Sequence, residues 1–183
     1  MRHTARAACA VVVLLSAWAT THVRAGEDPW ADFRFLIGSW ISDGRPEEGT
    51  GSFTLEPDLG GKILIRRNLA NLPAAKGRPA AKHEDLMIVY RVPGGQTFQA
   101  SYFDNEGHII QYSVRSLPDK KGLVFLSTLE KSLPRFRLTY TKSNADKVAV
   151  KFEIAPPNKA DAFKTYLEGT VRRKKGNERT NAG

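Results

Sequence analysis

The chain has 183 residues, a net charge of +9 and a single cysteine, Cys9, so an intramolecular disulfide is excluded. Its length predicts one ordinary domain with a hydrophobic core. Most of the net charge lies at the two ends of the chain. Residues 1–25 contribute +3 through three arginines, and residues 172–179 contribute +4 through five bases and one acid. The residues between them therefore carry only about +2 of the total of +9. This weak charge argues against a nucleic-acid partner.

The first 25 residues predict a cleaved export signal. A basic start precedes an apolar core and a small-x-small cleavage pattern: Arg2, His3 and Arg6, then residues 7–19, then Val23-Arg24-Ala25. The apolar run is shorter than the roughly 20 residues of a membrane span, so no span is expected. Cys9 lies at the start of the apolar core rather than after it, where it is badly placed for lipidation. We expect a periplasmic or secreted bacterial protein that begins at Gly26.

Beyond the signal, alternation of apolar and polar residues dominates, and turn residues interrupt it every eight to twelve positions or so. This pattern is typical of an all-β sandwich or barrel. We predict ten strands: 39–43, 51–56, 62–69, 85–92, 97–103, 108–116, 123–129, 135–142, 147–155 and 164–173. Helical turns are expected over residues 28–36 and 158–163, and a long loop over residues 70–84.

Short links make consecutive strands antiparallel, and closing the sheet into a barrel hides its edges. We therefore predict an all-β fold, a single closed antiparallel up-and-down barrel of about ten strands with a short N-terminal helical turn. The barrel domain spans residues 26–173. A basic tail, residues 174–183, is expected to be disordered.

Several motifs resemble those of calycin-type barrels: Phe35-Leu36-Ile37-Gly38-Ser39-Trp40, Gly49-Thr50-Gly51-Ser52-Phe53, Leu59-Gly60-Gly61-Lys62-Ile63-Leu64 and Arg137-Leu138-Thr139-Tyr140. The chain resembles uncharacterised bacterial DUF1579-like proteins and, more distantly, nitrobindin-like barrels. The resemblance implies that Gly38 and Trp40 close the barrel. It also implies that Trp40 packs against an arginine of the last strand, Arg172 or Arg173, through a cation–π contact.

Nitrobindin-like barrels hold haem through a histidine of the last strands, and this chain departs from that pattern. No histidine follows His108, and the last strand offers Tyr166 instead. Tyrosine can ligate ferric haem, so haem remains an alternative. We expect no cofactor.

Three tyrosines are candidate ligand-binding residues. Tyr90, Tyr112 and Tyr140 share a strand face with apolar residues two or four positions away, which places them on the more apolar face of their strands. In a barrel that face is the interior, where a tyrosine hydroxyl needs a partner. The hydroxyls could meet a ligand, or the residues could be ordinary core tyrosines.

Arg66 and Arg137 lie on the more polar faces of their strands, which indicates the exterior. If the alternation were inverted, Arg137 would enter the barrel and could grip a carboxylate, with Glu153 or Glu168 as an internal partner. His108 follows a turn at the barrel rim, where it could line the mouth or lie on the surface.

No metal site and no catalytic residue are predicted. His83-Glu84-Asp85 is a possible ligand set, but adjacent residues of a strand point to opposite faces, so a solvated loop end is the preferred interpretation. The chain has no P-loop, Rossmann fingerprint, nucleophile elbow or His-Glu-x-x-His motif.

The favoured hypothesis is an exported barrel that binds a small apolar or amphipathic molecule. The alternatives are an enzyme that uses interior Tyr, Arg and Glu residues, and an envelope protein that binds a partner.

Overall fold

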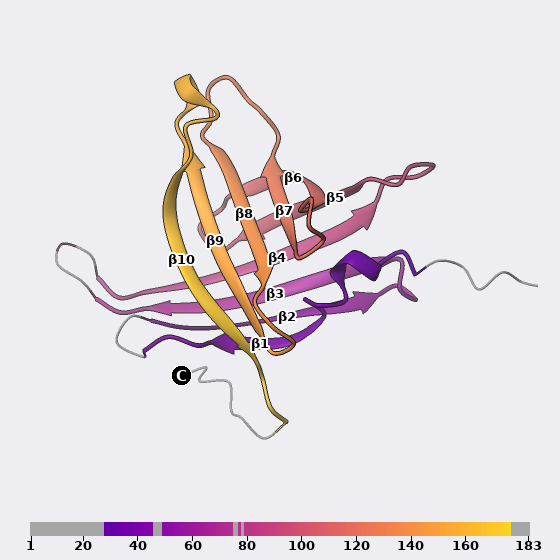
Figure 1. The fold of residues 1–183 in the computed structure, drawn as a ribbon. Coiled ribbons are helices and arrows are strands. Elements are labelled where there is room, and N and C mark those ends of the chain that lie inside the picture. The colour runs from indigo at the N-terminus through magenta and orange to yellow at the C-terminus, as the bar shows by residue number, and fades with distance from the viewer. Residues whose placement is uncertain (1–27, 46–48, 75–76, 78, 177–183) are drawn as a thin grey trace, which may run out of the picture.

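Ten antiparallel strands form one closed barrel in a computed structural model that describes residues 28–45, 49–74, 77 and 79–176 (Figure 1). Each strand pairs with its neighbours in sequence, and β1 pairs with β10. The strands are β1 Gly38–Ser42, β2 Thr50–Asp58, β3 Ile63–Leu72, β4 Ala81–Arg91, β5 Phe98–Asp104, β6 Ile109–Ser116, β7 Gly122–Ser127, β8 Arg135–Lys142, β9 Lys147–Ala155 and β10 Lys164–Arg173. The predicted fold class is confirmed.

The helical segments of the described residues are single 3₁₀ turns, η1 (Ala31–Phe33) and η3 (Pro157–Lys159). η1 lies inside the expected stretch 28–36, and η3 overlaps the expected stretch 158–163 but begins one residue before it. No helix in the described part of the chain has the length and apolar character needed to cross a bilayer.

The loop predicted over residues 70–84 is shorter than expected. β3 continues to Leu72 and β4 begins at Ala81, with Ala70 opposite His83 in the ladder. These strand ends carry small and charged residues, so main-chain pairing with the neighbouring strand decides their conformation rather than side-chain alternation. The expected signal, residues 1–25, and most of the expected tail lie outside the described residues.

One end of the barrel, here called the closed end, is plugged by η1 and the turn after it. Trp30, Phe33 and Leu36 are buried there. The Phe33 ring lies 5.0 Å from the Phe98 ring, and the Trp30 indole donates a hydrogen bond of 2.8 Å to the Gly61 carbonyl. Aromatic packing and this hydrogen bond therefore fix the plug to β5 and to the β2–β3 turn.

Arg173 ties the plug to the last strand. Its guanidinium lies 4.4 Å from the Trp40 ring centroid and donates hydrogen bonds to the carbonyls of Ile37 (3.0 Å) and Phe35 (3.3 Å). A Cβ at Gly38, where φ is +124°, would come within 2.7 Å of the Arg173 Nη1. Glycine is thus required at the point where the chain enters β1.

Arg172 was the alternative partner for Trp40, and that assignment is wrong. Arg172 pairs with Ile41 in the ladder and so faces outward, where its Nε lies 3.7 Å from an Asp43 carboxylate oxygen. The cation–π contact belongs to Arg173, because side chains of adjacent residues in a strand point to opposite faces.

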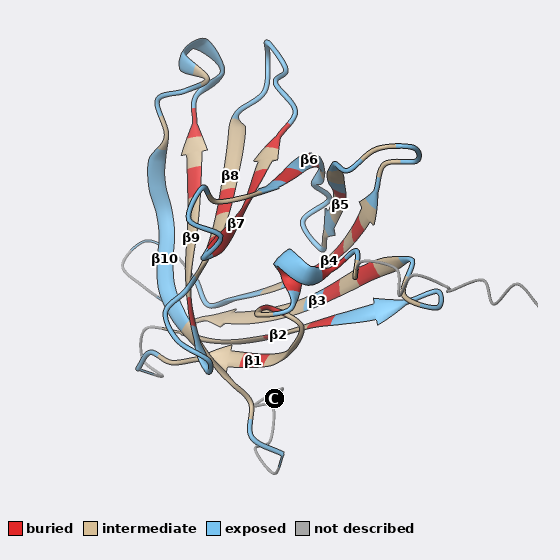
Figure 2. Ribbon diagram, turned by 45° about the vertical axis from the view of Figure 1, so that its right-hand side comes forward, coloured by how far each residue is buried: buried red, intermediate tan, exposed pale blue. Residues whose placement is uncertain are grey.

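The other end, here called the open end, is exposed along β10. Residues 164–170 of this strand are all exposed, and Figure 2 shows the strand pale blue over most of its length. Leu167 and Gly169 pair with Phe152 and Val150, whose side chains pack toward the core. A Cβ built at Gly169 meets no atom within 4 Å. The barrel interior beside β10 is therefore open, whereas the closed end is filled.

Candidate functional site

A cluster of polar side chains faces the interior from three consecutive strands. Arg66 and Asn68 come from β3, His83 and Asp85 from β4, and Tyr102 from β5. Asn68 pairs with Asp85 in the ladder, and Arg66 and Tyr102 both pair with the buried Met87. Because paired residues point to the same face, all five side chains face inward. We call these five residues the interior polar cluster.

An ion pair between Arg66 and Asp85 forms the centre of the cluster. The Arg66 Nη1 donates a hydrogen bond of 2.5 Å to Asp85 Oδ1, and both residues are less than a tenth exposed. Asp85 Oδ2 accepts a hydrogen bond of 2.8 Å from the Asn68 amide and lies 3.3 Å from His83 Nε2. The guanidinium also lies 5.3 Å from the Phe53 ring centroid. This buried pair is held by several hydrogen bonds, as a charge pair removed from water requires.

The two charges stabilise each other against burial. Burial alone would raise the pKa of Asp85, but the Arg66 guanidinium and hydrogen bonds from His83 and Asn68 outweigh it and hold the pKa below its usual range. Burial opposes the charged form of Arg66 as well, and the Asp85 carboxylate raises the pKa of Arg66 above its usual range. Both groups are therefore ionised at neutral pH.

His83 connects the cluster to the rim of the open end. Its Nε2 lies 3.1 Å from the Tyr102 hydroxyl, and its Nδ1 lies 3.0 Å from a Glu106 carboxylate oxygen. Hydrogen bonding to Asp85, opposed in part by burial and assisted by Glu106, raises the pKa of His83 to about 9. His83 is therefore a cation at neutral pH.

Two polar atoms deep in the barrel have no hydrogen-bond partner among the described residues. They are the Arg66 Nε and the Tyr140 hydroxyl. Both side chains lie near Phe53, whose ring centroid is 5.8 Å from that of Tyr140. Buried polar groups are nearly always paired, with protein, water or a ligand, so this region is suited to receive a hydrogen-bond acceptor.

An apolar wall faces the interior polar cluster across the barrel. Phe136 and Phe152 stack with centroids 5.9 Å apart, and Tyr166 meets Phe152 edge-on at 6.1 Å. Leu167 is 45% exposed beside them. These residues lie on β8, β9 and β10, and β9 is five strands from β4 in either direction around the barrel. One side of the open end is thus apolar and the other polar.

Two of the three predicted tyrosines lie inside the barrel. Tyr112 and Tyr140 are buried, as the alternation predicted. Tyr90 does not face the interior, and its hydroxyl donates to the Gln99 side chain at 3.2 Å on the outer surface. The inward residues of β4 include Met87 and Val89, and the outward ones are also apolar, so alternation assigned the wrong face.

Arg137 lies on the outer face of the barrel. Its guanidinium donates two hydrogen bonds to the Glu153 carboxylate, at 2.6 and 2.9 Å, and lies 4.1 Å from the Phe163 ring centroid. Of the two alternatives for Arg137, the exterior one is correct. Glu153 is its partner, but the pair faces outward.

His108 lies at the rim of the open end. Its side chain is mostly exposed, and its Nδ1 lies 2.8 Å from a carboxylate oxygen of Asp104.

The sequence interpretation missed the interior polar cluster. Arg66 was placed outside and His83 at a solvated loop end, and both placements are wrong. One signal was available: His83 and Asp85 are two positions apart, so once they belong to a strand they share a face. Arg66 and Asn68 have the same spacing.

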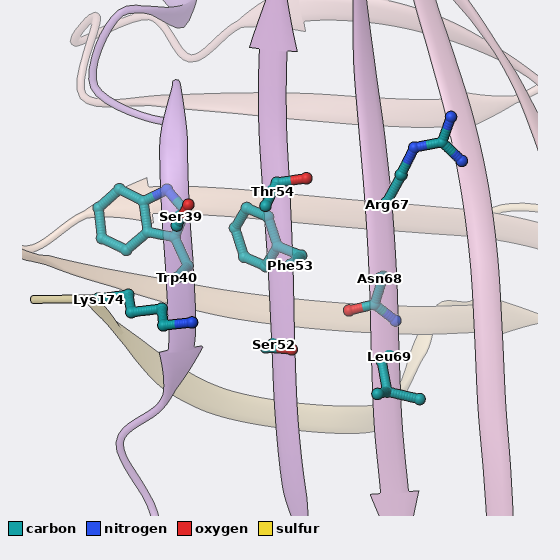
Figure 3. A pocket seen from close by; sticks show the side chains of 9 residues that line it. All are labelled: Ser39, Trp40, Ser52, Phe53, Thr54, Arg67, Asn68, Leu69 and Lys174. Atoms are coloured by element: carbon teal, nitrogen blue, oxygen red, sulfur yellow. The ribbon is translucent and has the colours of Figure 1, made fainter. Parts of the chain in front are cut away.

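A hollow of about 300 Å³ lies along β1, β2 and β3 and shares Asn68 with the interior polar cluster (Figure 3). It is lined by Ser39, Trp40, Ser52, Phe53, Thr54, Arg67, Asn68, Leu69 and Lys174. The charged residues among these nine are two cations, Arg67 and Lys174. The interior polar cluster is the stronger candidate site, because its charged groups are buried, paired and directed at one space.

The chain matches no protein-family model, and no curated protein matches it. The similarity to DUF1579-like and nitrobindin-like barrels remains a prediction from its motifs. The function is therefore inferred from the side chains of the barrel interior, which has a polar cluster on one side and an aromatic wall on the other.

Proposed function

We propose that this protein is an exported barrel that binds a small amphipathic molecule in the open half of its interior. One observation carries the proposal: the interior beside β10 is open. The inward-facing Leu167 is 45% exposed, and a Cβ at the inward-facing Gly169 would meet open space. A ligand pocket needs such a space between an apolar wall and a few polar groups.

The polar end of the ligand is a hydrogen-bond acceptor in this proposal. The Arg66 Nε and the Tyr140 hydroxyl are buried donors without a partner among the described residues. His83, cationic at neutral pH, adds positive charge nearer the rim. The apolar part of the ligand lies along Phe152 and Leu167.

The charge states in the interior favour binding over acid–base catalysis. Burial raises the pKa values of the Tyr102, Tyr112 and Tyr140 hydroxyls above their usual range, and that of Asp85 is lowered. A general acid or base works best with a pKa near the operating pH. These groups instead keep fixed protonation states, which suits a site that recognises a ligand by hydrogen bonds.

The test uses 8-anilinonaphthalene-1-sulfonate, a fluorescent amphipathic anion, and two tryptophan variants of β10. Gly169→Trp directs an indole into the open interior. Glu168→Trp, the control, adds the same side chain one residue earlier on the outer face. We expect wild type and Glu168→Trp to bind the probe alike, and Gly169→Trp to bind it about tenfold more weakly or worse.

Saturable binding that Gly169→Trp leaves unchanged would place the probe elsewhere and contradict an interior site. Circular dichroism of each variant verifies that the barrel has folded.

A further inference from the structure

Both histidines of the described residues approach the same hairpin at the open end. The β5–β6 turn carries Asp104, Glu106 and His108, and β4 brings His83 beside it. Asn105 fastens the turn to β4. Its backbone N–H donates to the Glu84 carbonyl at 3.0 Å, and its side-chain oxygen accepts from the Glu84 N–H at 3.0 Å.

The donor atoms of these side chains are close together. One ligand atom from each of His83, Asp104 and Glu106 lies within 4.8 Å of the other two. His83 Nδ1 is 3.0 Å from Glu106 Oε1. His108 Nδ1 is 2.8 Å from Asp104 Oδ2 and 3.9 Å from Glu106 Oε2. Donors of His83, Asp104 and Glu106 thus converge on one point of the rim, and the exposed His108 imidazole lies beside Asp104.

The surrounding contacts orient two of these donors. Asp104 Oδ1 accepts the backbone N–H groups of Glu106 (3.0 Å) and His108 (2.8 Å), which fixes its carboxylate. The His83 Nε2 lies 3.3 Å from the buried Asp85 carboxylate. The Nε2 proton of the His83 cation is directed at Asp85, so the proton on Nδ1, which faces Glu106, is the one that a metal ion displaces. A carboxylate behind a histidine is the usual support for a metal ligand.

We propose that His83, Asp104 and Glu106 bind one divalent transition metal ion, with Zn²⁺ the best match, and that the exposed His108 beside Asp104 turns to supply the fourth ligand. A set of imidazoles and carboxylates suits the tetrahedral preference of Zn²⁺, whereas Ca²⁺ and Mg²⁺ prefer sites made of oxygen atoms alone. Binding displaces a proton from each histidine Nδ1 that carries one. The site is distinct from the space beside β10, but His83 and Asp85 connect it to Arg66.

The test is calorimetric titration of the full chain with ZnCl₂ after treatment with EDTA. We expect one ion per chain. Glu106→Gln and His108→Ala change exposed side chains that the fold does not need, and each should weaken binding about 10- to 100-fold. Glu84→Gln, which removes a neighbouring carboxylate on the outer face of β4, should leave the affinity unchanged.

Substitution by Co²⁺ gives a second readout, because a tetrahedral site of this kind produces intense visible absorption bands that the two variants should lose. Binding that does not saturate at one equivalent, or an affinity that Glu106→Gln and His108→Ala leave intact, would overturn the proposal. The result is independent of the fluorescent-probe titration, in which the rim residues keep their wild-type identity.

Discussion

Arg66 and Asp85 show how a single pair of residues determines the character of the interior. Removing two charges from water is costly, and the hydrogen bonds around Asp85 offset that cost only while both partners are present. The pair therefore ties β3 to β4 and keeps a positive guanidinium inside the barrel, beside the Phe53 ring.

This coupling predicts a specific pattern of stability. Arg66→Met and Asp85→Asn should each lower the free energy of unfolding by about 3–5 kcal/mol, because each removes one partner of the buried pair. The double variant should lose clearly less than the sum of the two, since no buried charge is left without its partner. Urea denaturation gives the free energy of unfolding of the wild type, the two single variants and the double variant. Additive losses would show that the two residues act separately.

For individual residues, the sequence predicted the position of some site side chains and not of others. Tyr112 and Tyr140 alternate with polar neighbours, so their inward direction could be predicted. Tyr90 lies in a strand with apolar residues on both faces, and alternation cannot distinguish the inside of such a strand. Arg66 could not be placed, because its reason for being inside is a carboxylate that lies 19 positions further along the chain.

At the scale of elements, β8 and β9 are joined on the outer face by Arg137 and Glu153. The hydrogen bonds from Arg137, together with its charge, hold the pKa of Glu153 below its ordinary value of 4.5. A lowered pKa in the folded state means that the carboxylate stabilises the fold above about pH 4.5. That stabilisation is lost as the pH falls through the folded-state value.

Glu153→Gln should therefore be less stable than wild type at pH 7, by about 1 kcal/mol, because the Arg137 side chain remains partly exposed. The difference should shrink as the pH is lowered below the ordinary value and then disappear. Thermal unfolding of both proteins between pH 7 and pH 3 measures it. A difference that stays constant over this range would exclude the ion pair as its cause.

Element boundaries could be predicted where alternation is strong. The predicted strands 135–142, 147–155 and 164–173 coincide with β8, β9 and β10. The ends of β3 and β4 could not be predicted, because residues such as Ala70 and Lys82 carry no apolar pattern. Their strand conformation depends on the partner strand, which is a tertiary property.

The whole molecule has one plugged end and one open end. Closure depends on Arg173, which contacts the Trp40 ring and two carbonyls of the chain that leads into β1. The Arg173 side chain thus stabilises both the junction of β1 with β10 and the plug at the closed end.

Arg173→Ala should lower the free energy of unfolding by about 3 kcal/mol, from one cation–π contact and two hydrogen bonds made by a charged group. Arg172→Ala is the matched control, one residue away on the outer face. It should cost less than about 1 kcal/mol, as expected of a partly exposed ion pair. Similar losses in urea denaturation for the two variants would contradict the proposed role of Arg173 in closing the barrel.

In the proposed function, the open half of the barrel holds a small molecule. Mass spectrometry of the protein isolated from the organism that produces it, first under native and then under denaturing conditions, detects such a molecule. We expect a bound mass that is released on denaturation and is missing from Gly169→Trp prepared in the same way. A native mass equal to that of the chain alone, or an adduct that Gly169→Trp retains, would contradict it.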